Sequence, residues 1–156
     1  MKALTNEQYQ FQCPWMRSSI GQHVRHSLDH LRKPLENSND VVRYDFRDRN
    51  TDVENRVEAA KKALNEICER VETLDTDRLM RNMRVSFMLS ADGTECEIPS
   101  TLGREMAFAV HHCIHHNATI KQILLRNFPS CIDQLSSDFG TAPSTANFHK
   151  LNQKEA

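Results

Sequence analysis

The chain has no long apolar run and little of the chemistry that marks membrane or secreted proteins. No stretch approaches the roughly 18–20 apolar residues that a membrane span needs. The first residues, MKALTNE, lack the apolar core of a secretion signal. The five cysteines are odd in number and none forms a C-x-x-C pair, which is typical of reduced thiols rather than a disulfide framework. We therefore expect a cytoplasmic protein that does not associate with membranes.

An excess of charge of one sign is also absent. Lysine and arginine number 20 against 21 aspartates and glutamates, which gives a net charge of −1. A chain this close to neutrality, with basic and acidic residues interleaved, predicts no nucleic-acid partner. The sequence also contains no phosphate-binding loop, dinucleotide fingerprint or Ser-His-Asp order. Its 156 residues predict a single domain that spans residues 1–156.

What the sequence does contain is helical periodicity, interrupted once. Residues 1–17 show no clear element. Ser19 and Gln22 form a capping box that predicts a helix to about Leu35, and Thr51 with Glu54 forms a second one. The second helix should bury a stripe of apolar residues at helical spacing, namely Val53, Val57, Ala60, Leu64, Ile67 and Val71.

The interruption lies before the last long helix. Residues 83–98 alternate apolar and polar side chains around the turn signal Asp92-Gly93, so they predict a small β-hairpin. The longest helix should start at about 99–101 and end near Arg126. A short last helix should follow residues 139–145, and residues 149–156 should form a disordered tail. The predicted fold class is all-α, a helical bundle with one hairpin insertion.

Histidine is the most unusual part of the composition, with eight residues of which seven fall in two clusters. On a helical wheel for the longest helix, His112 and His116 share the apolar arc, whereas His111 and His115 fall on the opposite side. Since positions i and i+4 lie one above the other on one face, the first two rings can reach a single ion.

The other cluster, His23, His26 and His30, borders the apolar arc of the first long helix. A border position suits a metal ligand, because a catalytic ion needs protein on one side and an open position on the other. The pattern alone does not choose among these three. We expect His23, His30, His111 and His115 to face solvent, and one histidine of this cluster to join His112 and His116.

Five segments in order resemble the DinB-like superfamily. They are SSIGQHVRH (18–26), YDFRDR (44–49), STLGREM (100–106), HHCIHHNATI (111–120) and FGTAPST (139–145). The resemblance implies an up-down four-helix bundle with one metal site, whose ligands match His26, His112 and His116. It also implies a small-molecule substrate, since similar proteins include thiol transferases that use low-molecular-weight thiols and hydrolases.

The resemblance departs from the family at one place, because the family bundle usually opens with a helix before the stretch that resembles residues 4–9 here. Without that helix an apolar stripe such as residues 20–31 or 57–71 would lose a partner. We therefore expect either a homodimer, in which each copy covers the other, or a fragment that is poorly soluble.

Two functions fit these residues. The first is a metal-dependent enzyme, a thiol transferase or hydrolase type, in which three imidazoles hold zinc, nickel or iron(II) and leave one position open. Asp45, Arg47 and Arg49 could then bind substrate, or could equally be a solvated loop. The second is a non-catalytic structural or binding protein whose ion staples two helices. Such a closed site would need a fourth protein ligand, for which His30, His115 and Cys113 are candidates.

Overall fold

A computed structural model describes residues 4–36 and 41–152 of the chain. Its helices are α1 (Asn6–Gln10), α2 (Ile20–Glu36), α3 (Asp52–Asn55), α4 (Val57–Glu72), α5 (Thr76–Leu79), α6 (Leu102–Asn127), the 3₁₀ helix η1 (Pro129–Gln134) and α7 (Pro143–Asn152). Its strands are β1 (Val42–Arg43), β2 (Asn82–Met88) and β3 (Glu95–Thr101). None of the described helices is long and apolar enough to cross a membrane.

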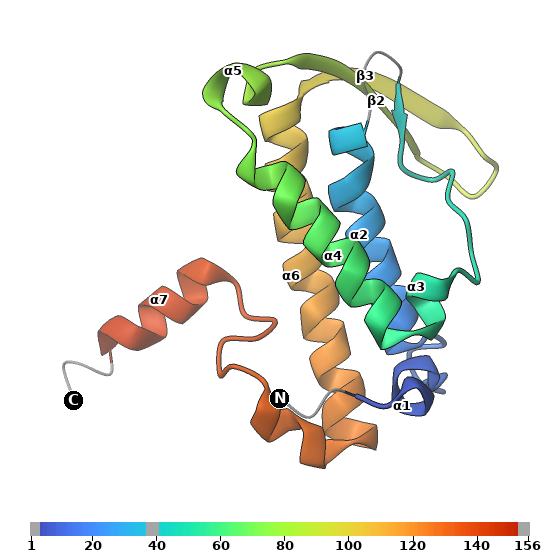
Figure 1. The fold of residues 1–156 in the computed structure, drawn as a ribbon, viewed down its shortest axis with the longest axis vertical. Coiled ribbons are helices and arrows are strands. Elements are labelled where there is room, and N and C mark those ends of the chain that lie inside the picture. Colours follow the sequence, from blue (N-terminus) through green and yellow to red (C-terminus); the bar gives the residue numbers. More distant parts are fainter. Residues whose placement is uncertain (1–3, 37–40, 153–156) are drawn as a thin grey trace.

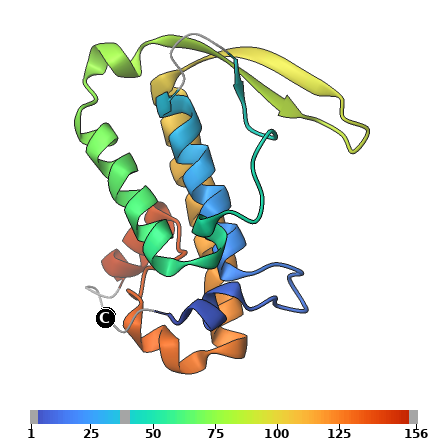
Figure 2. The ribbon, with the colours of Figure 1, turned by 45° about the vertical axis from the view of Figure 1, so that its right-hand side comes forward.

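The two long helices α2 and α6 form the frame of the molecule. They run antiparallel, side by side, and α4 packs against α2 (Figures 1 and 2). The predicted capping box starts α2: the Gln22 N–H donates to Ser19 Oγ, and the Ser19 N–H donates to Gln22 Oε1, both at 3.1 Å. Thr101 caps α6 by accepting from the Arg104 N–H. The starts of both long helices are therefore determined locally by the sequence.

A buried apolar core lies at the lower half of this frame, where α1, α2, α4 and α6 meet. Its buried members are Tyr9, Cys13, Ile20, Leu28, Ala60, Ile67, Ile120, Ile123 and Leu124. The chain path here depends on Gly21, because a Cβ at this position would lie 1.9 Å from the Glu54 carbonyl oxygen and 2.8 Å from the Tyr9 ring. Only a glycine lets α1 and α3 approach α2 this closely.

The strands correct the predicted all-α class in part. The hairpin is present, with β2 and β3 paired antiparallel from Asn82–Thr101 to Met88–Glu95. However, β1 pairs with β2 in parallel, so the hairpin belongs to a three-stranded sheet of order β1-β2-β3. A two-residue strand is too short to show a period of two in the sequence, and it forms because β2 offers it an edge. The mainly helical bundle is confirmed.

Several boundaries also differ from expectation. The segment that showed no clear element contains α1, which Thr5 and Gln8 begin with a capping box. The predicted second helix is split at Arg56, whose φ of −133° and ψ of 121° are extended, so α3 and α4 are separate helices. The predicted short last helix is α7. It includes residues 149–152 of the expected tail, whereas 153–156 lie outside the described residues.

The apolar stripe of α4 is only partly covered. Ala60 and Ile67 are buried against the core, but Leu64 is 45% exposed and Val71 is 40% exposed. The stripe of α2 is covered instead, with Ile20 and Leu28 buried. The expectation that one stripe would lack part of its cover therefore applies to α4, and pairing with a second copy remains a prediction.

The contact at Gly21 gives a test of the frame. The substitution Gly21→Ala should lower the free energy of unfolding by about 3 kcal/mol, because the new methyl group overlaps backbone that cannot move without displacing α3. The measurement is urea unfolding followed by circular dichroism. Gly103→Ala is the matched control. Its Cβ would lie 3.1 Å from the Leu79 backbone oxygen, against 1.9 Å from the Glu54 oxygen at Gly21, and alanine favours the helix. Equal stability of the two variants would contradict the close approach.

Candidate metal centre

Three histidines meet halfway along the frame. His26 lies on α2, and His112 and His116 lie one turn apart on the facing side of α6. The Nε2 atoms of His26 and His112 are 2.8 Å apart, and those of His112 and His116 are 3.1 Å apart. One ligand atom from each of the three residues lies within 4.8 Å of the others. The structure therefore brings together the three residues that the sequence and the resemblance suggested.

A chain of hydrogen bonds links His116 to Ser18, and one assignment of its protons leaves the inner nitrogen of His116 free to bind a metal. The carbonyl oxygen of Met16 can only accept, so we assign the Ser18 Oγ proton to that contact, at 3.2 Å. Ser18 Oγ then accepts from His23 Nε2 at 2.8 Å, and His23 Nδ1 accepts from His116 Nδ1 at 2.8 Å. A neutral imidazole carries one N–H. The Nε2 atom of His116 therefore presents a lone pair to the centre of the cluster.

This assignment tests whether the residues fit a metal ion. With a lone pair on His116 Nε2, the single hydrogen of His112 Nε2 can serve its contact with His116 or with His26. With this assignment, the contacts His26–His112 and His112–His116 cannot both be hydrogen bonds, because His112 Nε2 either donates to His116 or accepts from His26. A cation among the three nitrogens accepts all three lone pairs, which satisfies the cluster. The donor set and its proton arrangement therefore fit a divalent transition metal.

His23 and His30 correct the expectation that they face solvent. His23 is half-buried and holds the outer nitrogen of His116, as described above. His30 is 8% exposed and stacks on Tyr44 with ring centroids 4.6 Å apart. Its ring also lies 4.4 Å from that of His112. The spacing of His23, His26 and His30 at i, i+3 and i+7 places them on one helix face, but it carries no signal that this face is buried.

The remaining candidates for a fourth ligand do not join the cluster. His115 is exposed, as predicted. The Cys113 thiol contacts the backbone oxygen of Ser27 at 3.7 Å, and burial raises its pKa. His30 Nδ1 is buried without a hydrogen-bond partner, yet His30 is not part of the group whose ligand atoms converge. Within the described residues, three protein ligands and no fourth therefore converge on this point.

The electrostatics of the cluster keep its rings neutral. Burial lowers the pKa values of His26, His30 and His116 to about 3, and neighbouring imidazoles add to the shift. The positive charge of Arg47 lowers the pKa of His26 further. Burial lowers the pKa of His112 as well. Neutral imidazole is the form that binds a metal, so protons compete weakly for these nitrogens near pH 7.

One face of the cluster opens into a cavity of about 520 Å³. Its wall contains His23, His26 and His116 together with Arg17, Gln22, Arg25, Arg47, Arg49, Asn50 and Glu54. Two of the three residues expected to bind substrate, Arg47 and Arg49, therefore lie beside the histidines. An ion held by the three imidazoles could be reached from this cavity.

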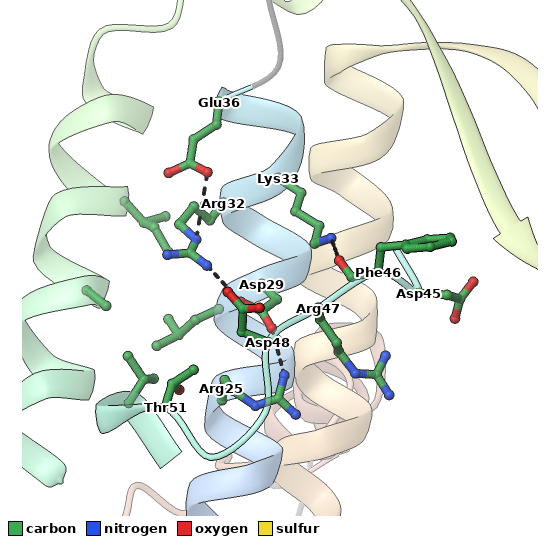
Figure 3. A pocket seen from close by; sticks show the side chains of 14 residues that line it. Arg25, Asp29, Arg32, Lys33, Glu36, Asp45, Phe46, Arg47, Asp48 and Thr51 are labelled. Carbon is green, nitrogen blue, oxygen red and sulfur yellow. Dashed lines mark hydrogen bonds and ion pairs between the residues drawn. The ribbon is translucent and has the colours of Figure 1, made fainter. Parts of the chain in front are cut away.

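Asp45, the third residue expected to bind substrate, lies elsewhere. Its carboxylate accepts from the backbone N–H of Met88 at 2.6 Å, so it ties the segment before α3 to the end of β2. Lys33 holds the same segment to α2 by donating to the backbone oxygens of Arg43 and Phe46. In Figure 3 the side chains of Asp45 and Arg47 point to the right of α2, whereas those of Arg32 and Glu36 lie to its left, toward α4.

A second, larger pocket of about 730 Å³ lies between α2, α4 and this segment (Figure 3). Four of its charged groups pair with one another: Asp29 with Arg25 at 2.7 Å and with Arg32 at 3.1 Å, and Arg32 with Glu36 at 3.9 Å. We interpret this side of the pocket as a structural ion-pair network. The segment before α3 adds Asp45, Arg47 and Asp48 to the lining.

Comparison with known proteins bears on the family. A family model described as the DinB superfamily matches residues 1–120. The chain is also similar to FK506-binding protein 5 of Rhizopus delemar, with 36% identity over 109 residues, which is 67% of this chain and 26% of that protein. The chain thus spans about a quarter of the length of this curated relative. No solved structure matches the chain.

The buried imidazoles predict how the stability of the metal-free protein depends on pH. In the unfolded chain these histidines titrate near 6.5, whereas His26, His30 and His116 titrate near 3 when folded. Between these values the unfolded state binds more protons. Stability is therefore retained above about pH 6.5 and falls as the pH decreases toward 3.

Urea unfolding of the metal-free protein between pH 7.5 and pH 5 measures this dependence. We expect the midpoint to fall steadily below pH 6.5, and to fall less steeply in His30→Gln. His149→Ala, which removes an exposed imidazole, should behave as the unaltered chain. A midpoint that stays constant from pH 7.5 to pH 5 would show that the imidazoles are not desolvated.

Proposed function

This chain belongs to the DinB superfamily, and we propose that it holds one divalent transition-metal ion at His26, His112 and His116 for a metal-dependent reaction on a small molecule. The observation that carries the proposal is the convergence of three imidazole nitrogens from α2 and α6 at the wall of an open cavity. Zinc, nickel and iron(II) are the metals that best suit a set of imidazole ligands.

The reaction class we propose is a transfer or a hydrolysis. A metal ion with three protein ligands acts as a Lewis acid on a water molecule or a thiol in its open position. Low-molecular-weight thiols are therefore one candidate class of substrate. The cavity beside His26 and His116 supports this proposal, because a closed structural site would leave no approach for a substrate.

The surrounding residues have positioning roles in this proposal. The hydrogen bonds from His116 through His23 to Ser18 hold the His116 ring with its Nε2 lone pair directed inward. His30 packs against His26 and His112 and excludes water from that side. Tyr44 keeps His30 in place by stacking on it, and its hydroxyl donates to Glu105 at 2.7 Å. Such partners orient metal ligands and limit solvent access.

The ligand assignment predicts a graded series of metal affinities. His26→Ala, His112→Ala and His116→Ala should each abolish stoichiometric binding of zinc or nickel at pH 7.5. His23→Ala should weaken binding by roughly 10- to 100-fold, since it leaves all three ligands but frees the His116 ring. Isothermal titration with each metal provides the measurement. His111→Ala is the control from the exposed side of α6, and a loss there as large as in His112→Ala would refute the assignment.

Removal of the metal should affect activity more than fold. The apolar contacts of α2 and α6 do not involve the ion, so EDTA should leave the helical circular dichroism intact. The loss of a ligand present at 100 times its dissociation constant would cost about 2.7 kcal/mol and lower the melting temperature. Collapse of the helical signal on chelation would instead indicate that the ion is a structural staple between two helices.

A further inference from the structure

The cavity beside the three histidines has an unbalanced charge. Four arginines line it, and Glu54 is its one carboxylate. Glu54 is already engaged, because its carboxylate lies 3.0 Å from Arg25 Nε, and both side chains are buried. Arg25 pairs with Asp29 as well. The positive charges of Arg17, Arg47 and Arg49 thus remain without a counter-charge in the cavity.

These three arginines differ from the other cationic side chains near α2. Within residues 4–36 and 41–152, none of the three has a carboxylate within 4.0 Å or a side-chain hydrogen bond. By contrast, Arg25 and Arg32 both pair with Asp29. The Nε atom of Arg47 is buried and has no hydrogen-bond partner. A buried guanidinium nitrogen without a partner is costly, and an oxyanion would satisfy it.

The backbone gives a second, independent indication. Arg17 and Asn50 have φ values of 51° and 56°, and they are the non-glycine residues in the described part of the chain with positive φ. Both line this one cavity. A left-handed conformation is unfavourable for arginine, and such strain concentrates at ligand sites.

A metal ion at the histidines would increase the imbalance. The three imidazoles are neutral, so a divalent ion adds its full charge beside Arg47, which already acts electrostatically on His26. From this we propose that the cavity binds an anionic group of the substrate, a carboxylate or a phosphate, between Arg47 and the metal centre, with Arg17 and Arg49 at the entrance. This inference rests on the proposed function, since it names the class of substrate for the same site.

The chemistry shared by the two anions is a pair of oxygens that a guanidinium group can bind through two parallel hydrogen bonds. Arg47 is the principal residue because it is half-buried, whereas Arg17 and Arg49 are exposed and act more by attracting an anion than by binding it. Neutral molecules of the same shape should therefore bind poorly in this cavity.

Titration calorimetry tests the proposal with malonate, inorganic phosphate and, as the uncharged match of malonate, malonamide. The metal-free protein should bind at least one anion at least 10-fold more tightly than malonamide, and the stronger of the two identifies the group. Arg47→Gln should weaken that binding about 10-fold or more. Arg47→Lys should recover part of it, because the charge returns without the planar fork. The control is Arg56→Gln, which removes the same charge from a side chain that is 68% exposed outside the cavity.

A second measurement separates this proposal from the metal site. With cobalt(II) loaded, malonate should change the visible absorption of the ion and bind more tightly than to the metal-free protein. Equal binding of malonate and malonamide, or no effect of Arg47→Gln in a variant with an unchanged melt, would overturn the anion site even if cobalt binds. Anion binding that depends on Arg47 in a chain that binds no cobalt would support the anion site and overturn the metal centre.

Discussion

The contact between α2 and α6 is the interaction on which the rest of the structure depends. Where α2 begins and α6 ends it is an apolar interface, built from Ile20 on α2 and from Ile120, Ile123 and Leu124 on α6. Farther along, the two helices present imidazoles to each other. Desolvated rings with unshared lone pairs weaken a helix interface. The apolar end must therefore supply the stability that holds the polar end in register.

A buried ion-pair network extends this frame to the segments around the cavity. Arg25 reaches from α2 to Glu54 on α3 and to Asp29 on its own helix, and all three side chains are buried. Removing any one partner would leave an unpaired charge, so the network specifies one position of α3 relative to α2. Gly21 permits the same approach sterically. Together they determine where the segment that carries Arg47 and Arg49 enters α3.

The sequence predicts well the features that depend on neighbouring residues, and poorly those that depend on residues far apart in the chain. A capping box predicted the start of α2, apolar periodicity predicted α6, and the helical wheel put His112 and His116 on the inner face, because each depends on residues a few positions apart. The position of His30 could not be predicted this way. Its burial depends on Tyr44, which is placed by Glu105 and the sheet, all distant in sequence.

The same limit explains the different outcomes for the segment at 44–49. From the sequence, Asp45, Arg47 and Arg49 were equally good candidates to bind substrate. However, the edge of β2 takes the Asp45 carboxylate, while Arg47 and Arg49 face the cavity. Which neighbour each residue contacts is decided here by pairing with a strand that begins more than 30 residues later in the chain. A short irregular segment has no period from which this could be read.

Charge is distributed unequally on the two sides of this segment. On the α4 side, Arg25 and Arg32 have carboxylate partners, whereas beside the histidines Arg17, Arg47 and Arg49 have none among the described residues. If an anion and a metal ion occupy adjacent positions, each reduces the repulsion that the other experiences. Binding free energies are reciprocal, so an anion that prefers the metal-loaded site must raise the affinity for the metal by the same factor. The neutral histidine cluster and the arginines would then act as one site, with an affinity for metal that depends on whether the substrate anion is bound.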